Sequence, residues 1–221
     1  ELLSHKDRAR LLALAEIVPL TISQVVCEPG NKASHVYFPI NGFISLVSRT
    51  AHGSGVEVGM IGREGMLGSH LALGVAHWPL HGLVQGEGKA RRIAVREFRN
   101  ELGRNPALQK IIHRFIHVQM AQMATSAACL RFHLVGPRLA RWLLMSHDRA
   151  RADSFRLTHE FLAYMLGVRR VGITAAAGAL QRSGLIEYHR GDLTVLDRSE
   201  LEATACGCYA ADQETYASLL R

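Results

Sequence analysis

The chain has few cysteines and no long apolar run, and these two absences exclude several classes of protein. Its four cysteines are too few and too scattered for a disulfide framework, which is typical of a protein from a reducing cytoplasm. No apolar run approaches the roughly 18 residues that span a bilayer, so we expect no membrane-spanning helix. The opening segment "ELLSHKDRARLL" is charged and amphipathic, unlike a secretory signal.

Acidic residues are also scarce relative to basic ones. The chain has 19 Asp and Glu against 26 Lys and Arg, a formal charge of +7, in a globular composition of 48% hydrophobic residues. This balance favours a polyanionic partner, with nucleic acid ahead of an anionic membrane surface. Charge alone leaves open a basic protein that binds no polyanion.

Residues 20–95 show short β-type segments separated by turn signals. These segments are "TISQVV", "VYFPI", "FISLVSR", "VEVGMI", "GLVQ" and "KARRIAV". Their spacing of about ten residues, with Gly, Pro and Asn between them, predicts an antiparallel sandwich or barrel. The sharpest turn signal is Asn41-Gly42, which predicts a β-hairpin.

A long helix is predicted after residue 105. Asn105 is a suitable N-cap and Pro106 suits the first helical position. The helix has two apolar stripes, which predicts contact with the β-domain on one side and with a second copy of the chain on the other. We assign the dimer interface to the first stripe and leave open that the helix is instead buried within a larger monomer. The first stripe consists of Leu108, Ile111, Phe115 and Val118, and the second of Ile112, Ile116, Met123, Ala127 and Leu130.

The last third of the sequence predicts a winged helix-turn-helix. Three helical segments, "PRLARWLLMSHDRAR", "LTHEFLAYML" and the stretch after Gly167, precede two β-type segments that flank Arg190-Gly191-Asp192, a tight hairpin signal. Thr158 suits the N-cap position of the second helical segment. We therefore expect an α+β protein with three parts: an antiparallel β-domain (1–103), a dimerisation helix (104–134) and a winged helix-turn-helix DNA-binding domain (135–221).

The segment "LGVRRVGITAAAGALQRSGLIEY" predicts the recognition helix. Its core face comprises Ile173, Ala176, Ala177 and Leu180, whereas the opposite face carries two N-terminal arginines followed by small residues. A helix in the major groove needs long donors at its N-terminal end and little bulk behind them. We expect Arg170 to read guanine, Arg169 and Thr158 to bind phosphates, and Thr174 to touch a thymine methyl group or a phosphate. The predicted DNA-binding residues are Thr158, Arg169, Arg170, Thr174 and Gln181.

The residues that carry these predictions resemble the C-terminal domain of Crp/Fnr-type bacterial transcription regulators. The resemblance is specific at "LTHEFLAYMLGVRR" and "SGLIEYHRGDLTVLD" and extends, as an order of domains, over the whole chain. It implies that residues 1–103 form a jelly-roll sensor domain like those that bind cyclic nucleotides. It also implies a homodimer that binds a pseudo-palindromic operator in double-stranded DNA. It also implies RNA polymerase and a small-molecule effector as possible partners.

Two positions of the recognition helix depart from the family. The resemblance places the family's phosphate-contacting threonine on Thr158 and its guanine-reading arginine on Arg170. The glutamate that usually follows this arginine is Val171 here, and a later arginine is Ala175. The operator is therefore expected to differ from the family consensus.

The sensor segment also departs from the family. Cyclic-nucleotide binders of the family hold the cyclic phosphate with an Arg-Ser or Arg-Thr pair, where this chain has Leu80-His81. Without that arginine, a charge-assisted contact to the phosphate is lost. We therefore expect an effector other than classical cyclic AMP, with the candidate effector residues Arg63, Glu64, His81 and Gln85.

The sequence gives little support for an iron–sulfur cluster or another metal site. Only Cys27 lies in the first hundred residues, so the iron–sulfur cluster of the oxygen-sensing branch is not expected. The pair Cys206 and Cys208 lacks evident further ligands. His113 and His117, one turn apart on the long helix, are more typical of a polar stripe, and His77 and His81 have no paired motif for a metal or haem, so no metal site is predicted.

Catalytic motifs are equally scarce. The strands lack the His-x-His of metal-dependent β-barrel enzymes, and no Ser–His–Asp elbow or phosphate-binding Lys-Ser/Thr loop is present, so we expect no enzyme. The competing hypothesis is a small-molecule-binding or enzymatic β-roll protein whose C-terminal domain mediates protein contacts.

Overall fold

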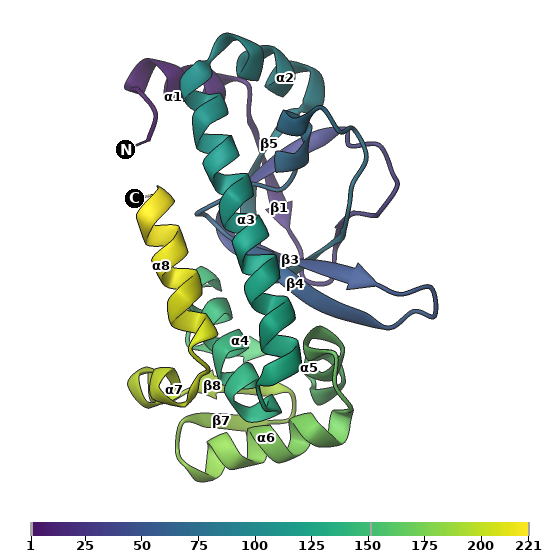
Figure 1. Cartoon of the computed structure of the whole chain (residues 1–221), viewed down its shortest axis with the longest axis vertical. Helices are drawn as coiled ribbons and strands as arrows, with labels where there is room; N and C mark the ends of the chain where they lie inside the picture. Colours follow the sequence, from purple (N-terminus) through teal and green to yellow (C-terminus); the bar gives the residue numbers. More distant parts are fainter. Residues whose placement is uncertain (1, 151, 221) are drawn as a thin grey trace.

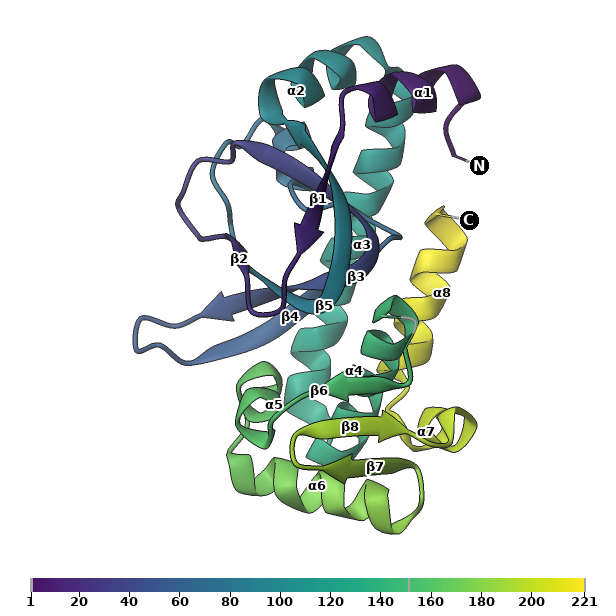
Figure 2. The same cartoon turned by 180° about the vertical axis from the view of Figure 1, so that it is seen from behind.

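The computed structural model describes residues 2–150 and 152–220. A β-roll occupies one end of the molecule, a helical domain with a small sheet occupies the other, and one long helix runs along both (Figures 1 and 2). The α+β class predicted from the sequence, with a β-roll followed by a winged helix-turn-helix, is confirmed.

The β-roll is an antiparallel sheet with strand order β1-β5-β3-β4, and β2 pairs with β5. Its strands are β1 (Glu16–Leu20), β2 (Val25–Cys27), β3 (His35–Arg49), β4 (Gly55–Ile61) and β5 (His81–Ala94). Helix α1 (His5–Ala13) precedes the sheet, the 3₁₀ helix η1 (Ser69–Leu73) lies between β4 and β5, and α2 (Val95–Arg104) follows. Side chains such as Val36, Ile44, Val84, Ile93 and Phe98 fill the core of the roll.

The predicted hairpin at Asn41-Gly42 is wrong, because β3 continues through both residues. Gly42 has φ +72°, and the pairing of β3 with β5 shifts register around it, which is the signature of a β-bulge. A Cβ at Gly42 would overlap the Gly86 carbonyl oxygen, so the glycine permits the close approach of β5. The segments "GLVQ" and "KARRIAV", predicted as two strands, likewise belong to the single strand β5.

Helix α3 (Pro106–Phe132) begins as predicted, with the Asn105 Oδ1 accepting a hydrogen bond from the Leu108 N–H at 3.0 Å. The structure contradicts the predicted role of the first apolar stripe as the dimer interface. Leu108, Phe115 and Val118 are only 3%, 4% and 1% exposed within a single chain. Residues buried this deeply in one protomer have no surface left for a partner. Of the stripe predicted to form the dimer interface, only Ile111 stays partly exposed.

The C-terminal domain contains α4 (Val135–Ala150), β6 (Ser154–Arg156), α5 (His159–Leu166), α6 (Arg170–Arg182), β7 (Ile186–His189) and β8 (Asp192–Val195). The predicted hairpin is confirmed, because β7 and β8 pair across two turn residues with positive φ, Arg190 and Gly191. Two further helices, α7 (Arg198–Thr204) and α8 (Cys208–Leu220), follow the hairpin. Helix α8 runs back beside α3 toward the β-roll (Figure 1).

Within the residues that the structure describes, no helix combines the length and the apolarity needed to cross a membrane.

Candidate nucleic-acid interface

Helices α5 and α6 form the helix-turn-helix. The Thr158 hydroxyl caps α5 by accepting a hydrogen bond from the Phe161 N–H at 3.1 Å, which confirms the predicted cap. Helix α5 ends at Gly167, whose φ of +61° is a conformation that glycine adopts readily. The chain then turns, and Arg169 stands at the N-cap position of α6.

Helix α6 has one buried face and one exposed face of low bulk. Ile173, Ala176, Ala177 and Leu180 are buried in the domain core, as predicted. Between the two N-terminal arginines and Gln181, the exposed face carries short side chains. Val171 is 72% exposed, a large fraction for an apolar side chain at the surface of a monomer. The exposed residues of α6 and its N-cap are Arg169, Arg170, Val171, Thr174, Ala175, Ala179, Gln181 and Arg182.

His159 and Thr174 hold α5 against α6. His159 Nδ1 lies 3.0 Å from Thr174 Oγ1, and the Thr174 hydroxyl donates to the Arg170 carbonyl oxygen at 3.2 Å. The His159 ring stacks on Tyr188 of β7, with centroids 4.5 Å apart. Burial, and secondarily the charge of Arg170, lowers the pKa of His159, so its imidazole is neutral at pH 7. The start of α6 is therefore fixed by both α5 and the hairpin.

Gln181 connects the other end of α6 to the hairpin. Its Oε1 accepts a hydrogen bond from the Tyr188 N–H at 3.1 Å, which leaves its amide NH₂ group as the available donor. Gln181, Thr174 and His159 line one shallow groove between α6 and Tyr188. The structure thus brings four predicted DNA-binding residues onto one helix and its N-cap, and it places Thr158 at the start of the neighbouring helix.

Comparison with known proteins identifies this domain. The sequence profile of the Crp-like helix-turn-helix domain matches residues 137–204. The chain is a transcription regulator whose residues 137–204 form a Crp-like, DNA-binding helix-turn-helix domain. The fold agrees, because the structure of FixK2 from Bradyrhizobium japonicum superimposes with a TM-score of 0.72 at 13% identity over 87% of this chain and 98% of the other.

Two further relatives agree with this identification. The c-di-GMP-responsive global regulator CLP of Xanthomonas campestris gives a TM-score of 0.71 at 17% identity, covering 88% of this chain and all of the other. A global nitrogen regulator from Nostoc sp. (strain PCC 7120) is 23% identical over 177 residues, 76% of this chain and 79% of its own. At these identities the structural likenesses establish the fold.

The regulator packs its DNA-binding domain directly onto the β-roll. The β3–β4 hairpin reaches α5, where Tyr164 lies against Gly55 and Val56 lies against Gly167. On the same strand, Glu57 of β4 faces Trp142 and the guanidinium groups of Arg141 and Arg149 on α4. Burial is the largest influence on Glu57 and raises its pKa to about 7, although the arginines oppose the shift.

The partly buried Glu57 predicts that stability changes with pH. The unfolded chain releases this proton near the ordinary pKa of 4.5, whereas the folded chain holds it until about pH 7. Between these values the unfolded state binds fewer protons, so the free energy of unfolding should fall as the pH rises and level off above about pH 7. A shift of this size corresponds to roughly 3 kcal/mol. Glu57→Gln should remove that slope in denaturant titrations from pH 4.5 to 7.5.

The control for this prediction is Glu87→Gln, which removes an exposed carboxylate from β5 of the regulator. It should leave the pH dependence of the wild-type chain unchanged. An equal slope in Glu57→Gln and the wild type would show that other groups determine the pH dependence.

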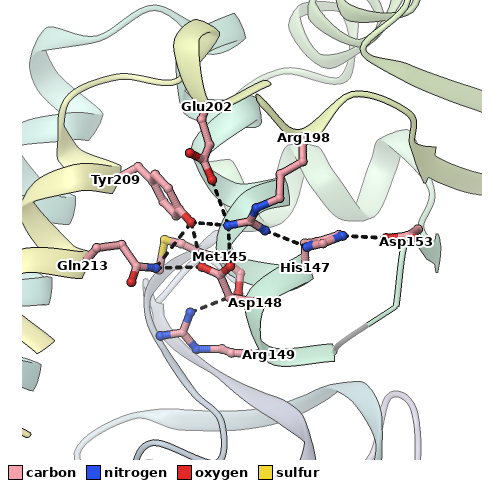
Figure 3. Close-up of polar contacts among 9 residues, drawn as sticks. All are labelled: Met145, His147, Asp148, Arg149, Asp153, Arg198, Glu202, Tyr209 and Gln213. Carbon is pink, nitrogen blue, oxygen red and sulfur yellow. Dashed lines mark hydrogen bonds and ion pairs between the residues drawn. The ribbon is translucent and has the colours of Figure 1, made fainter. Parts of the chain in front are cut away.

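A polar network holds α7 and α8 against α4 (Figure 3). The Arg198 guanidinium donates to Asp148 at 2.8 Å, and its distances to the Tyr209 hydroxyl and to His147 Nδ1 are both 2.7 Å. Asp148 also accepts hydrogen bonds from Tyr209 at 2.9 Å and from Gln213 at 2.7 Å. This network fixes the segment after the hairpin, which no sequence motif had pointed to.

The structure separates the four residues predicted to bind an effector. Arg63 and Glu64 line a polar cavity of about 500 Å³ beside α4 and α8, and Glu64 pairs with Arg149 Nε at 2.8 Å. His81 is buried on β5, with Nδ1 4.0 Å from Glu28 Oε1, and Gln85 is partly buried further along the same strand. These four side chains do not line a common cavity among the described residues.

A different cavity lies between the β-roll and α3. Its volume is about 420 Å³, and it opens beside Leu73 and Val75, two exposed apolar residues. Its lining is almost entirely apolar. The lining residues include Leu46, Ile61, Leu67, Trp78, Leu80, Ile116, Met120 and Met123. The sequence analysis had singled out none of them as site residues, because scattered apolar residues look like core until a cavity is seen.

Proposed function

We propose that the regulator acts as a homodimer on a two-fold-symmetric operator and that an apolar effector, rather than classical cyclic AMP, controls it. The observation that carries the proposal is the free face of α3. In Figure 1 no other described element lies in front of this helix. Six residues on that face are exposed, at alternating spacings of four and three: His113, His117, Met120, Ala124, Ala127 and Arg131.

This row, which we name the α3 seam, has the spacing of a coiled coil. A repeat of 3.5 residues keeps one stripe of a helix facing its partner. The small side chains of Ala124 and Ala127 allow two helices to approach closely, and Met120, 64% exposed, supplies apolar area. We therefore place the dimer interface on the α3 seam. It replaces the predicted interface along Leu108, Ile111, Phe115 and Val118.

In this dimer, the two α6 helices would enter successive major grooves on one face of the duplex. Arg170 and Thr174 would meet base edges, whereas Arg169 and Thr158 would bind phosphates. The exposed Val171 and Ala175 would present an apolar surface where the family usually has charged side chains. The low bulk of the α6 surface supports close approach to the bases.

Selection from randomised double-stranded DNA tests this function. The purified full-length chain should enrich an inverted repeat whose half-sites are centred about 10 base pairs, or a multiple of one helical turn, apart. Enrichment of single half-sites, or of no sequence above the starting pool, would contradict a symmetric dimer on DNA.

The apolar cavity between the β-roll and α3 supports the effector proposal. Met120 belongs both to the cavity lining and to the α3 seam, and Ile116 and Met123 lie beside it. A ligand in this cavity would therefore change the packing of the two α3 helices. The chemistry of the lining, with few polar groups, suits a hydrophobic molecule and offers no arginine to a cyclic phosphate.

A ligand-binding measurement tests the effector proposal. A hydrophobic dye that fluoresces in apolar cavities should bind at about one molecule per chain and should be displaced by medium-chain fatty acids. Cyclic AMP at the same concentrations should displace none of it. Leu73→Glu, which places a charge at the mouth of the cavity, should weaken dye binding by roughly tenfold, the loss expected for about 1.4 kcal/mol. Displacement by cyclic AMP alone would overturn the assignment.

A further inference from the structure

Four potential metal ligands converge where α3 meets the segment between α7 and α8. Cys129 and His133 stand four residues apart at the end of α3, and Cys206 and Cys208 come from the turn into α8. Their ligand atoms all lie within 4.8 Å of one another. The sequence analysis found the Cys-x-Cys pair without further ligands, and the fold supplies the two that were lacking.

We propose that Cys129, His133, Cys206 and Cys208 bind one tetrahedral zinc-type divalent ion. Three thiolates and one imidazole are a common ligand set of structural zinc sites. Zn–S bonds of about 2.3 Å and Zn–N bonds of about 2.0 Å, at tetrahedral angles, place two sulfurs about 3.8 Å apart and a sulfur and a nitrogen about 3.5 Å apart. The distance from Cys129 Sγ to Cys206 Sγ is 3.5 Å, and that from Cys208 Sγ to His133 Nδ1 is 3.5 Å.

The compactness of the group favours a single ion over an iron–sulfur cluster. In a cluster, several iron and sulfide atoms separate the protein ligands, so the cysteine sulfurs lie further apart than around one ion. Here every pair of ligand atoms is within 4.8 Å. The soft thiolates also disfavour Mg²⁺ and Ca²⁺, which prefer oxygen ligands.

The surroundings fit a site with net negative charge. Three thiolates around a divalent ion leave one negative charge, and two buried cations, Arg138 and Arg141, line the same cavity as Cys129. Both are held in place: Arg138 donates to the Leu166 carbonyl oxygen, and Arg141 donates to Asp212 at 2.6 Å. Such outer groups orient metal ligands and tune their affinity.

The ion would connect the end of α3 to the DNA-binding domain. His133 is the last residue before the turn into α4, which begins at Val135, so the site spans the junction between α3 and the DNA-binding domain. The network around Arg198 and Asp148 holds α7 and α8 on the other side of the junction (Figure 3). A bound ion would therefore fix the direction in which α4 leaves α3. This inference does not depend on the operator, the dimer or the effector proposed above.

Metal analysis of the native chain tests the proposal. Full-length protein without a histidine tag, purified under reducing conditions, should contain about one zinc ion per chain by mass spectrometry. Replacing the ion with Co²⁺ should give the visible bands of a tetrahedral thiolate site. Because loss of an outer group already costs 10–100-fold in metal affinity, His133→Ala and Cys208→Ser should each weaken Zn²⁺ binding by more than about 100-fold.

Two matched variants control for the general loss of a histidine or a thiol. His117→Ala removes an exposed histidine from the same helix, and Cys27→Ser removes the cysteine of the β-roll. Both should keep one zinc ion per chain. If a ligand variant fails to fold, the Co²⁺ spectrum of the wild type still decides. A wild-type chain that takes up neither Zn²⁺ nor Co²⁺ with its thiols reduced, or that binds them equally well without Cys208 and His133, would overturn the proposal.

Discussion

Arg170→Ala should reduce affinity for the selected operator by roughly 5- to 150-fold, the equivalent of about 1–3 kcal/mol. Arg170 is exposed at the first position of α6, where the helix end would meet base edges, and Thr174 accompanies it one turn later. A bidentate arginine distinguishes guanine from the other bases, so its loss should also relax one position of each half-site. Titration of the operator and of variants with that base pair changed would measure both effects.

Arg169→Ala should behave differently, because a phosphate contact carries no sequence information. Its loss should weaken binding to operator and random DNA alike and reduce the salt dependence by about one unit of slope. Lys32→Ala, which removes an exposed cation from the β-roll, should change neither quantity appreciably. If Arg170→Ala lowered affinity equally for cognate and random sequences, Arg170 would be a phosphate contact and another residue would read the base.

The features that the sequence predicted correctly depend on local chemistry. Asn105 and Thr158 both cap helices, because an oxygen-bearing side chain just before a helix satisfies its first free N–H groups. The turn at Arg190-Gly191 and the buried face of α6 also follow from a few neighbouring residues. The order of domains could be predicted for the same reason, since each part has its own periodicity.

The features that the sequence predicted wrongly or missed depend on long-range packing. Asn41-Gly42 is a turn signal in isolation, but pairing with β5 keeps the chain extended, and the glycine serves a bulge instead. The stripe containing Phe115 is as apolar as a dimer interface, but the β-roll already covers it. Cys129 and Cys206 are 77 residues apart in the chain, so only the fold shows that their sulfurs meet.

The second prediction with a large expected effect concerns which face of α3 forms the dimer interface. Met120→Glu should convert the dimer into monomers in light scattering, because a carboxylate in the middle of the α3 seam would be buried opposite its own copy. Operator affinity should then fall by more than about 100-fold, since two linked half-site contacts become one. The isolated subunit should stay folded, because Met120 is 64% exposed.

Two comparisons make this result specific to the α3 seam. Ile17→Glu introduces the same charge at a residue of β1 that is 61% exposed, and it should leave the protein dimeric. Phe115→Glu places a charge in the core between α3 and Gly65, so it should lower the unfolding midpoint sharply before it changes assembly. A Met120→Glu chain that remains dimeric with full operator affinity would mean that the copies meet through a different face. The apolar cavity would then no longer be coupled to the spacing of the two α6 helices through Met120.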